Sequence, residues 1–448
     1  MDAKLLKDDK RPGVRQAEPP WRRWLALALF CSLAILQNMC FVGYSAVLAP
    51  SARYYNVSQS KINFLSTLAS IVFVPCVFVL MPMANRHGLR APMLLSSALL
   101  AAAGALRIAF PASYSALLVA QTLNGAAGPL VMNVPPLLSA TWFPAAQRTL
   151  ATAIGFSAMT VGVAAVFLLA PAMVHAAADV ARLNNLHAAL SALQLLAVAA
   201  AFPVRPAAPP SASAGAARVQ FFAGLQALWR APPPSQGDHA TEPTAERARS
   251  AGRRAAAERR AFWWLVLVAS ASNGVYGAWS NLFDSLLSDR FSEARIGWLA
   301  FANNVSGLFG SVIFGALVDR GATSLKGGLV GALALTTLAQ LAFFAAHDAG
   351  GYGLLLATCA ASGFFFNAAA PMQLELAAEL TFPVGEETSA AVISLGYALS
   401  NIVGMFVGDA VTPRTFNIAL AAFLALCAAA IGVLVVNGDA RQRIDHMG

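Results

Sequence analysis

Twelve apolar runs, each long enough to cross a bilayer, divide this chain of 448 residues. A transmembrane helix needs about 20 apolar residues, and backbone polar groups cannot stay unpaired in lipid, so each run is predicted to be a helix. Only 11% of the residues are charged, whereas soluble domains have about 25%. The predicted spans are residues 24–48, 62–83, 91–110, 114–138, 150–174, 183–204, 262–286, 296–317, 327–347, 353–376, 388–411 and 415–436.

Lys and Arg are distributed unequally between the two ends of these spans. One side, which bears both tails and the long central segment, holds 23 of the 30 basic residues, and the other side holds six. The positive side is predicted to be cytosolic, with both termini on it. Because these charges lie between apolar runs, the lipid bilayer is the expected partner. Binding to nucleic acid is not expected. The remaining basic residue, Arg107, lies near the outer end of the third span and is expected to snorkel to the interface.

Short motifs recur in the two halves of the chain at nearly one offset. Met83-Ala84-Asn85-Arg86 is followed 234 residues later by Leu317-Val318-Asp319-Arg320, and Phe143-Pro144 is followed 239 residues later by Phe382-Pro383. Two fused repeats in an apolar chain predict an all-α membrane protein with two pseudo-symmetric six-helix bundles and a pathway between them. The predicted divisions are a tail (1–23), a bundle (24–204), a linker (205–261), a bundle (262–436) and a tail (437–448).

The linker is rich in Pro, Ala, Ser and Arg and is expected to be mostly disordered. One segment, Val219–Arg230, has the apolar residues of an amphipathic helix lying on the inner leaflet. The alternative is a collapsed linker without a role.

The turn after the eighth span reads Gly315-Ala316-Leu317-Val318-Asp319-Arg320 and resembles the signature of the major facilitator superfamily. In the first-half copy, Asn85 stands where that family has an acidic residue. In that superfamily the turn after helix 8 approaches the start of helix 5, and the turn after helix 2 approaches the start of helix 11. The resemblance therefore implies a major facilitator fold with facing charges at these two places.

The charges at the two places complement each other. Asp319 would face Arg148, and Arg86 with Arg90 would face Glu386 and Glu387, which also begin a helix. Such pairs would latch the cytosolic mouth, while the alternative is that they are surface charges that only set topology. The candidate gating residues are Asn85, Arg86, Arg90, Arg148, Asp319, Arg320, Glu375, Glu379, Glu386 and Glu387.

Helices 1, 4, 7 and 10 line the pathway in this fold, and each carries an amide near its middle. Polar groups at mid-membrane are costly and usually mark a pathway, although amides can also tie helices together. Aromatic residues beside amides suit a flat polar ring, stacked on one face and hydrogen-bonded at its edge. The candidate binding residues on these grounds are Asn38 (beside Gln37), Asn124, Asn273, Tyr276, Trp279, Asn367, Tyr397 and Asn401.

Carboxylates occur only at the ends of the spans, with Asp284 and Asp409 outside and Glu375 inside. A neutral or weakly basic small molecule is therefore favoured as cargo, and any coupling to protons must run through these groups or His87, or be absent. The sequence contains no nucleotide-binding motif and no catalytic or metal-binding constellation. Neither an enzyme nor a cofactor is expected.

Two segments, Gln121–Phe143 and Phe366–Val384, resemble the solute carrier family that includes the feline leukaemia virus subgroup C receptor-related proteins. Gly274–Asp284 is similar to its branch named "disrupted in renal carcinoma". The family carries haem, choline or ethanolamine, and the branch is linked to export of pyridoxine from lysosomes. The resemblance implies that the choline carriers' cage tryptophan and glutamine fall at Phe41 and Thr160, which makes choline less favoured.

The sequence therefore predicts a secondary transporter that moves pyridoxine or a similar ring by alternating access. Choline, ethanolamine and haem are the alternative cargoes, and a receptor or nutrient sensor that no longer transports is the alternative of another class. Asp2-Ala-Lys-Leu5-Leu6 resembles an acidic dileucine sorting signal. A lysosomal or other endomembrane location is favoured over the plasma membrane.

Overall fold

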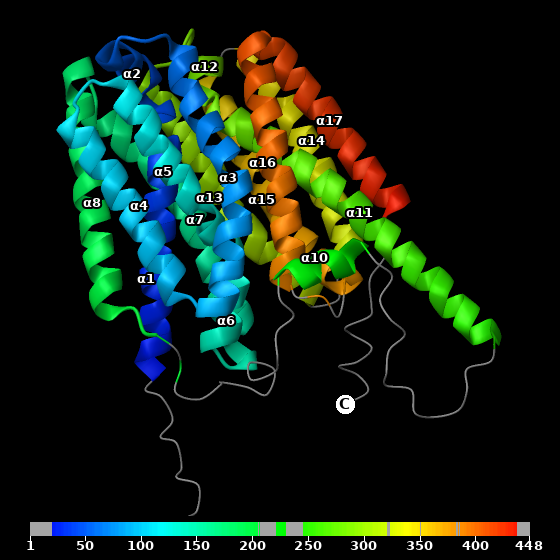
Figure 1. Ribbon diagram of the computed structural model, residues 1–448. Coiled ribbons are helices and arrows are strands. Elements are labelled where there is room, and N and C mark those ends of the chain that lie inside the picture. The colour runs from blue at the N-terminus through cyan, green and yellow to red at the C-terminus, as the bar shows by residue number, and fades with distance from the viewer. Residues whose placement is uncertain are drawn as a thin grey trace, which may run out of the picture.

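The computed structural model describes residues 20–204, 206, 221–229, 245–319, 323–349, 351–381, 384 and 386–436. In this part of the chain every regular element is a helix, and the long helices stand side by side (Figure 1). The prediction of an all-α membrane fold is confirmed. The long helices of the first half are α1 (Pro20–Val42), α3 (Gln59–His87), α4 (Arg90–Ala109), α5 (Tyr114–Asn133), α7 (Ala145–Met173) and α8 (Val180–Ala201).

The long helices of the second half are α11 (Ala245–Asn281), α13 (Glu293–Asp319), α14 (Leu325–Ala349), α15 (Tyr352–Thr381), α16 (Glu386–Ala410) and α17 (Pro413–Leu434). Among the described residues, 11 helices are long and apolar enough to cross a membrane. The twelfth is α11, whose apolar part is interrupted by Ser270, Ser272 and Asn273. Polar residues in the middle of α11 thus lower its hydropathy without changing its place in the bundle.

Short helices cap the bundle at its two ends. We call the end where α1 begins the linker side; it carries α6 (Pro135–Trp142) and α10 (Phe221–Trp229). The other end, the opposite side, carries η1 (Ser45–Val47), α2 (Leu48–Tyr55) and α12 (Phe283–Leu287) at the top of Figure 1. A further short helix, η2 (Ala177–Asp179), precedes α8.

Three boundaries differ from the sequence prediction. The first span ends at Val42 instead of residue 48, and the fourth is divided after Asn133, because Pro135 and Pro136 cannot continue the hydrogen bonding of α5. The linker was expected to reach residue 261, but α11 already begins at Ala245. The amphipathic helix expected within the linker is present as α10.

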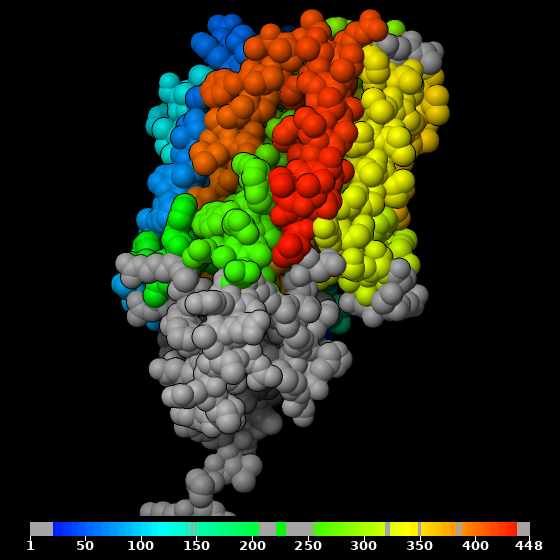
Figure 2. All heavy atoms as spheres, turned by 90° about the vertical axis from the view of Figure 1, so that its right-hand side faces the viewer, coloured from blue at the N-terminus to red at the C-terminus, as the bar shows by residue number. Residues whose placement is uncertain are grey.

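The same helix pairs pack in the two halves. In the first half α1 packs on α7, α3 on α5, and α4 on α8; their counterparts in the second half are α11 on α16, α13 on α15, and α14 on α17. The halves meet along two further pairs, α7 with α13 and α3 with α16. Figure 2 shows α16 (orange) beside α3 (blue) on one face of the molecule. The duplicated sequence motifs therefore correspond to a duplicated packing scheme.

Helices α13 and α15 cross closely because glycines face a backbone carbonyl on each side. Gly310 of α13 lies against the carbonyl oxygen of Phe364, and Gly363 of α15 lies against the carbonyl oxygen of Asn303. Small residues at such crossings allow two helix backbones to approach in lipid, where no hydrophobic force drives them together.

Gly310→Ala should separate α13 from α15, because the added Cβ would overlap the Phe364 carbonyl oxygen. We expect the free energy of unfolding to fall by about 1–3 kcal/mol, measured as a lower Tm of the purified protein in detergent. Gly331→Ala on α14 is the matched control, since a Cβ there would meet nothing within 4 Å. Equal losses of Tm in the two variants would contradict this account.

Candidate functional site

Side-chain hydrogen bonds cross the seam between the halves near the middle of the bundle. Ser70 of α3 donates to Asn401 Oδ1 of α16 over 3.2 Å, and Asn401 Nδ2 donates in turn to the carbonyl of Gly274 on α11 over 3.2 Å. Closer to the linker side, Ser394 of α16 donates to Asn133 Oδ1 of α5 over 2.8 Å. The predicted residue Asn401 thus joins three helices from both halves.

The seam is closed at the opposite side. Asn63 Nδ2 of α3 donates to Ser285 Oγ over 2.9 Å and to Asp409 Oδ1 over 3.1 Å. On the other pair of helices, Gly297 of α13 lies so close to the carbonyl oxygen of Phe167 on α7 that no Cβ fits between them. Each of the two helix pairs that join the halves is therefore in contact at this end.

A cavity of about 70 Å³ lies between the first half and α16. Its lining contains no charged side chain. Ligand pockets of soluble proteins commonly measure roughly 300–1,000 Å³, so this cavity is contracted. The side chains around it are Gln37, Asn38, Phe41, Ala69, Ser70, Phe73, Val131, Met132, Met159, Tyr397 and Ala398, with Gly125 and Gly128.

Three of the predicted binding residues line this cavity: Asn38, Phe41 and Tyr397. The Asn38 amide nitrogen donates to the carbonyl of Ala34, one turn earlier in α1, over 2.9 Å. Asn124 lies fully buried on α5, and neither atom of its amide has a partner among the described residues. Thr160, next to the lining residue Met159, is half-buried on α7.

Besides Asn401 at the seam, four predicted residues lie among the helices of the second half and do not line the described cavity. Asn273 donates to Gln373 Oε1 over 2.7 Å, which joins α11 to α15. Trp279 is fully buried and donates to Asn417 Oδ1 on α17 over 2.7 Å.

Tyr276 and Asn367 also contact neighbouring helices of the second half. The Tyr276 hydroxyl accepts a hydrogen bond from Asn303 over 2.9 Å, and its ring stacks on Phe366 with centroids 3.7 Å apart. The Asn367 side chain packs against Gly307 of α13. In this conformation these aromatic and amide groups hold the second half together.

The contribution of α3 was not predicted from the sequence, which placed candidate binding residues on the helices of the first, fourth, fifth, seventh, tenth and eleventh spans. Ser70 and Phe73 of α3 line the cavity. Asn63, Ser66 and Ser70 follow one another at three- and four-residue spacing, and all three are buried. A polar line at helical spacing in an apolar span was the available signal that α3 faces the seam.

The predicted charge latch falls on the part of the chain that is not described. Arg320 and the side chains of Arg148, Asp319, Glu386 and Glu387 lie outside the described residues. Arg90 Nη2 donates to the carbonyl of Ala199 at the end of α8 over 3.2 Å. Asn85 is half-buried, Arg86 and Glu375 are exposed, and Glu379 is buried. The latch stays a prediction.

The expectation that Arg107 snorkels is wrong. Its side chain is only 3% exposed. Nη2 donates to Gln121 Oε1 over 3.4 Å and Nη1 lies 3.8 Å from Cys40 Sγ. The face of α4 that carries Arg107 packs inward against α5 and α1, so the guanidinium cannot reach the interface.

Asp284 lies beyond α11, in the short helix α12 at the opposite side. It is buried, and Oδ1 has no hydrogen-bond partner among the described residues. Burial raises the pKa of Asp284 from 3.8 to about 7, and the nearby carboxylate of Glu293 adds to the effect. A group at this closed end of the seam therefore titrates near neutral pH.

The fold matches solved transporters. A POT family peptide transporter in an auto-inhibited state is similar with a TM-score of 0.61 at 15% identity, covering 92% of this chain and 98% of that chain. A POT family transporter in complex with 5-aminolevulinic acid is similar with a TM-score of 0.65 at 12% identity, covering 91% and 95%. At these identities the likeness shows the fold alone.

Curated relatives cover most of the chain. Solute carrier family 49 member 4 homolog of Xenopus tropicalis is 28% identical, covering 87% of this chain and 85% of the relative. Solute carrier family 49 member A3 of Danio rerio is 28% identical, covering 83% and 75%. The choline/ethanolamine transporter flvcr2a of Danio rerio is 24% identical, covering 94% and 88%.

These relatives confirm the resemblance to the receptor-related solute carrier family. The family model of the Major Facilitator Superfamily matches residues 25–408, and over that length the chain belongs to this superfamily of membrane transporters.

Proposed function

We propose that this transporter carries pyridoxine or a similar neutral or weakly basic ring by alternating access. The observation that carries the proposal is the lining of the cavity at the seam. It combines amide and aromatic side chains and contains no charged group. A strongly charged cargo would bring an uncompensated charge into this lining, which is costly at low dielectric.

The lining supplies both kinds of contact that a hydroxylated ring requires. The amides of Gln37 and Asn38 can each donate and accept hydrogen bonds at the edge of the ring. Phe41, Phe73 and Tyr397 offer aromatic faces or edges on which the ring can pack. Amides fix the orientation of the cargo, while the aromatic groups remove its apolar surface from water.

Loading requires the halves to move, because a cavity of about 70 Å³ is too small for such a ring. The contacts of Asn63 and Gly297 close the opposite side. We propose that rocking of the two bundles breaks these contacts at one end while the charge latch forms at the other. Among the described residues few hydrogen bonds cross the seam, which makes these contacts reversible.

Choline or ethanolamine is the second candidate cargo. Relatives from Danio rerio carry the name choline/ethanolamine transporter, and Phe41 lines the cavity and offers a π face to a cation. Haem follows. A non-transporting receptor or sensor remains the alternative of another class. We further propose that the linker side is cytosolic and that the protein works in the lysosomal membrane.

Asn38→Leu should lower pyridoxine uptake into proteoliposomes about tenfold or more, because it removes a hydrogen-bonding group from the cavity. Asn304→Leu is the matched control. Asn304 also donates to the carbonyl four residues earlier in its helix and is also half-buried, but it does not line the cavity. If both variants transport at the wild-type rate, Asn38 does not contact the cargo.

Uptake should depend on pH through Asp284. Its pKa is about 7 while it is buried in the closed seam and 3.8 when it is hydrated. The closed state is therefore most stable below pH 3.8, and its stability falls as pH rises to about 7. Opening at the opposite side should become easier across this range and change little above it.

Asp284→Asn should flatten the pH profile of uptake between pH 4 and 7, because an amide does not titrate. Asp289→Asn, close in sequence on the same side, serves as the control and should keep the wild-type profile. A wild-type profile in the Asp284→Asn variant would exclude this group as the pH sensor.

Competition should identify the cargo. We expect unlabelled pyridoxine to suppress uptake of labelled pyridoxine fully, and choline, ethanolamine and haem to suppress it weakly or not at all. Accumulation in proteoliposomes distinguishes a carrier from a sensor, which would bind the ligand without accumulating it. If the proteoliposomes take up labelled choline but no pyridoxine, the cargo is choline or ethanolamine instead of pyridoxine.

A further inference from the structure

Arg107 is a buried cation without an acidic partner among the described residues. Its donors reach only the neutral acceptors Gln121 Oε1, at 3.4 Å, and Cys40 Sγ, at 3.8 Å. Its Nε has no partner among the described residues. A guanidinium stays charged at any physiological pH, and a buried charge without a partner is strongly destabilising. Another group must balance it.

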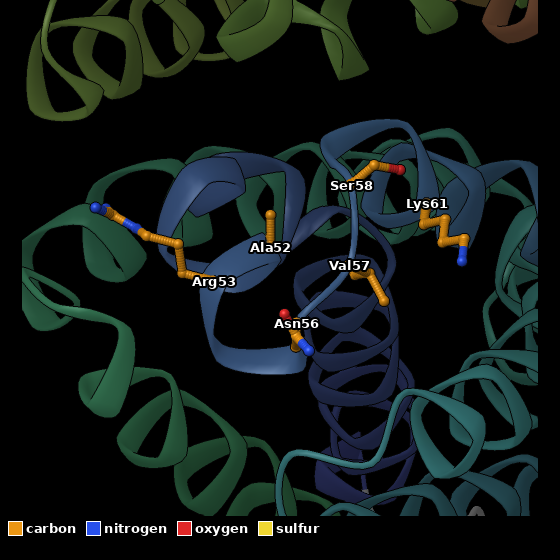
Figure 3. Close-up of a pocket in the computed structure, with 6 residues that line it drawn as sticks. All are labelled: Ala52, Arg53, Asn56, Val57, Ser58 and Lys61. Atoms are coloured by element: carbon orange, nitrogen blue, oxygen red, sulfur yellow. The ribbon is translucent and has the colours of Figure 1, made fainter.

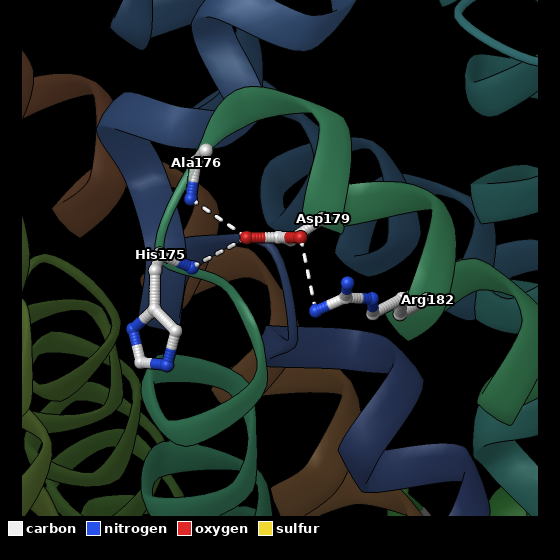
Figure 4. Close-up of polar contacts among 4 residues, drawn as sticks. All are labelled: His175, Ala176, Asp179 and Arg182. Atoms are coloured by element: carbon white, nitrogen blue, oxygen red, sulfur yellow. Dashed lines mark hydrogen bonds and ion pairs between the residues drawn. The ribbon is translucent and has the colours of Figure 1, made fainter.

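The first half offers no carboxylate for this purpose. Between residues 20 and 204 the sequence contains one acidic residue, Asp179. Figure 4 shows its contacts: Oδ2 accepts the backbone N–H groups of His175 and Ala176 over 3.1 and 2.9 Å, and Oδ1 pairs with Arg182 over 3.1 Å. Helix α4, which carries Arg107, packs chiefly against helices of its own half. The balancing charge is therefore expected from solution.

A second unpartnered group borders the same place. His187 of α8 is fully buried, and neither ring nitrogen has a partner among the described residues. The Tyr44 ring lies next to both groups, with its centroid 5.6 Å from the Arg107 guanidinium carbon and 6.5 Å from that of the His187 ring. A neutral imidazole carries one N–H. Arg107 and His187 thus both hold hydrogen-bond donors without acceptors.

A surface hollow at the opposite side carries two basic residues. A hollow of about 390 Å³ at the opposite side lies between Arg53 and Lys61, which Figure 3 shows on its two flanks. Tyr55 lies next to this hollow in the chain, and its hydroxyl accepts a hydrogen bond from Asn184 over 2.9 Å. Asn184 also accepts the hydroxyl of Tyr44 over 2.6 Å. Cationic side chains at this surface raise the local concentration of anions.

We infer that Arg107, His187 and Tyr44 enclose a binding site for a small monovalent inorganic anion of about the size of chloride. The site is separate from the seam cavity but connected to it. Gln121, which accepts from Arg107, donates to the carbonyl of the cavity residue Phe41 over 3.2 Å. A bound anion would hold the Arg107 side chain and, through Gln121, the backbone of α1 beside the cavity.

The test uses the purified full-length protein in lipid nanodiscs. Its Tm is measured in sodium chloride, bromide or gluconate at constant ionic strength. Chloride and bromide should raise the wild-type Tm by about 2–5 °C relative to gluconate, because they bind the folded state. Arg107→Gln should abolish this difference. Arg414→Gln, which changes an exposed arginine of the second half, should retain it.

A purely structural arginine predicts a different pattern. Its loss would lower Tm equally in all three salts, whereas an anion site predicts that Arg107→Gln is at least as stable as wild type in gluconate. Should Arg107→Gln fail to fold, bromide-soaked crystals of the wild type should show anomalous scattering beside Arg107. A wild-type Tm that is identical in the three salts, a halide effect that survives in Arg107→Gln, or crystals without that scattering would overturn the inference.

Discussion

Hydrogen bonds between side chains of α3 and α16 join the two halves, and the bond between Ser70 and Asn401 connects two buried side chains. Ser70 to Asn401 and Asn63 to Asp409 belong to this set. In a low dielectric each broken bond leaves a costly unpaired group. The two halves can therefore separate at one end only if that end becomes hydrated. Such a coupling between hydration and the seam fits the proposed alternating access, and it gives the unpartnered Asp284 carboxylate a role at the closed end.

The two bundles use their polar residues differently in this conformation. In the second half, Asn273, Tyr276 and Trp279 are all hydrogen-bonded to other helices of the same half. In the first half, Asn38 lines the cavity and Asn124 has no partner among the described residues. These bonds tie the helices of the second bundle to one another, whereas the first bundle keeps free hydrogen-bonding capacity beside the cavity.

Each of the four predicted pathway helices does carry an amide within a long helix. These amides are Asn38, Asn124, Asn273 and Asn367. Which of them faces the cavity depends on the rotation of each helix about its own axis. That rotation is set by packing, for example by Gly307 against Asn367. The helical spacing of Asn63, Ser66 and Ser70 on α3 is visible in the sequence. Its role at the seam could be recognised only once the structure placed α3 there.

The sequence by itself determined the number of helices, their duplication and the class of protein, because hydrophobic length and backbone hydrogen bonding leave a chain in lipid no other choice. Only the tertiary structure decided whether an individual polar side chain faces the cavity, another helix or the interface. Arg107 stands at the end of a span, where a side chain can equally turn to the interface or inward; the packing of α4 on α5 turned it inward. Contacts between different helices, including that of Arg107 with Cys40 on α1, made that choice, and no local pattern encodes them.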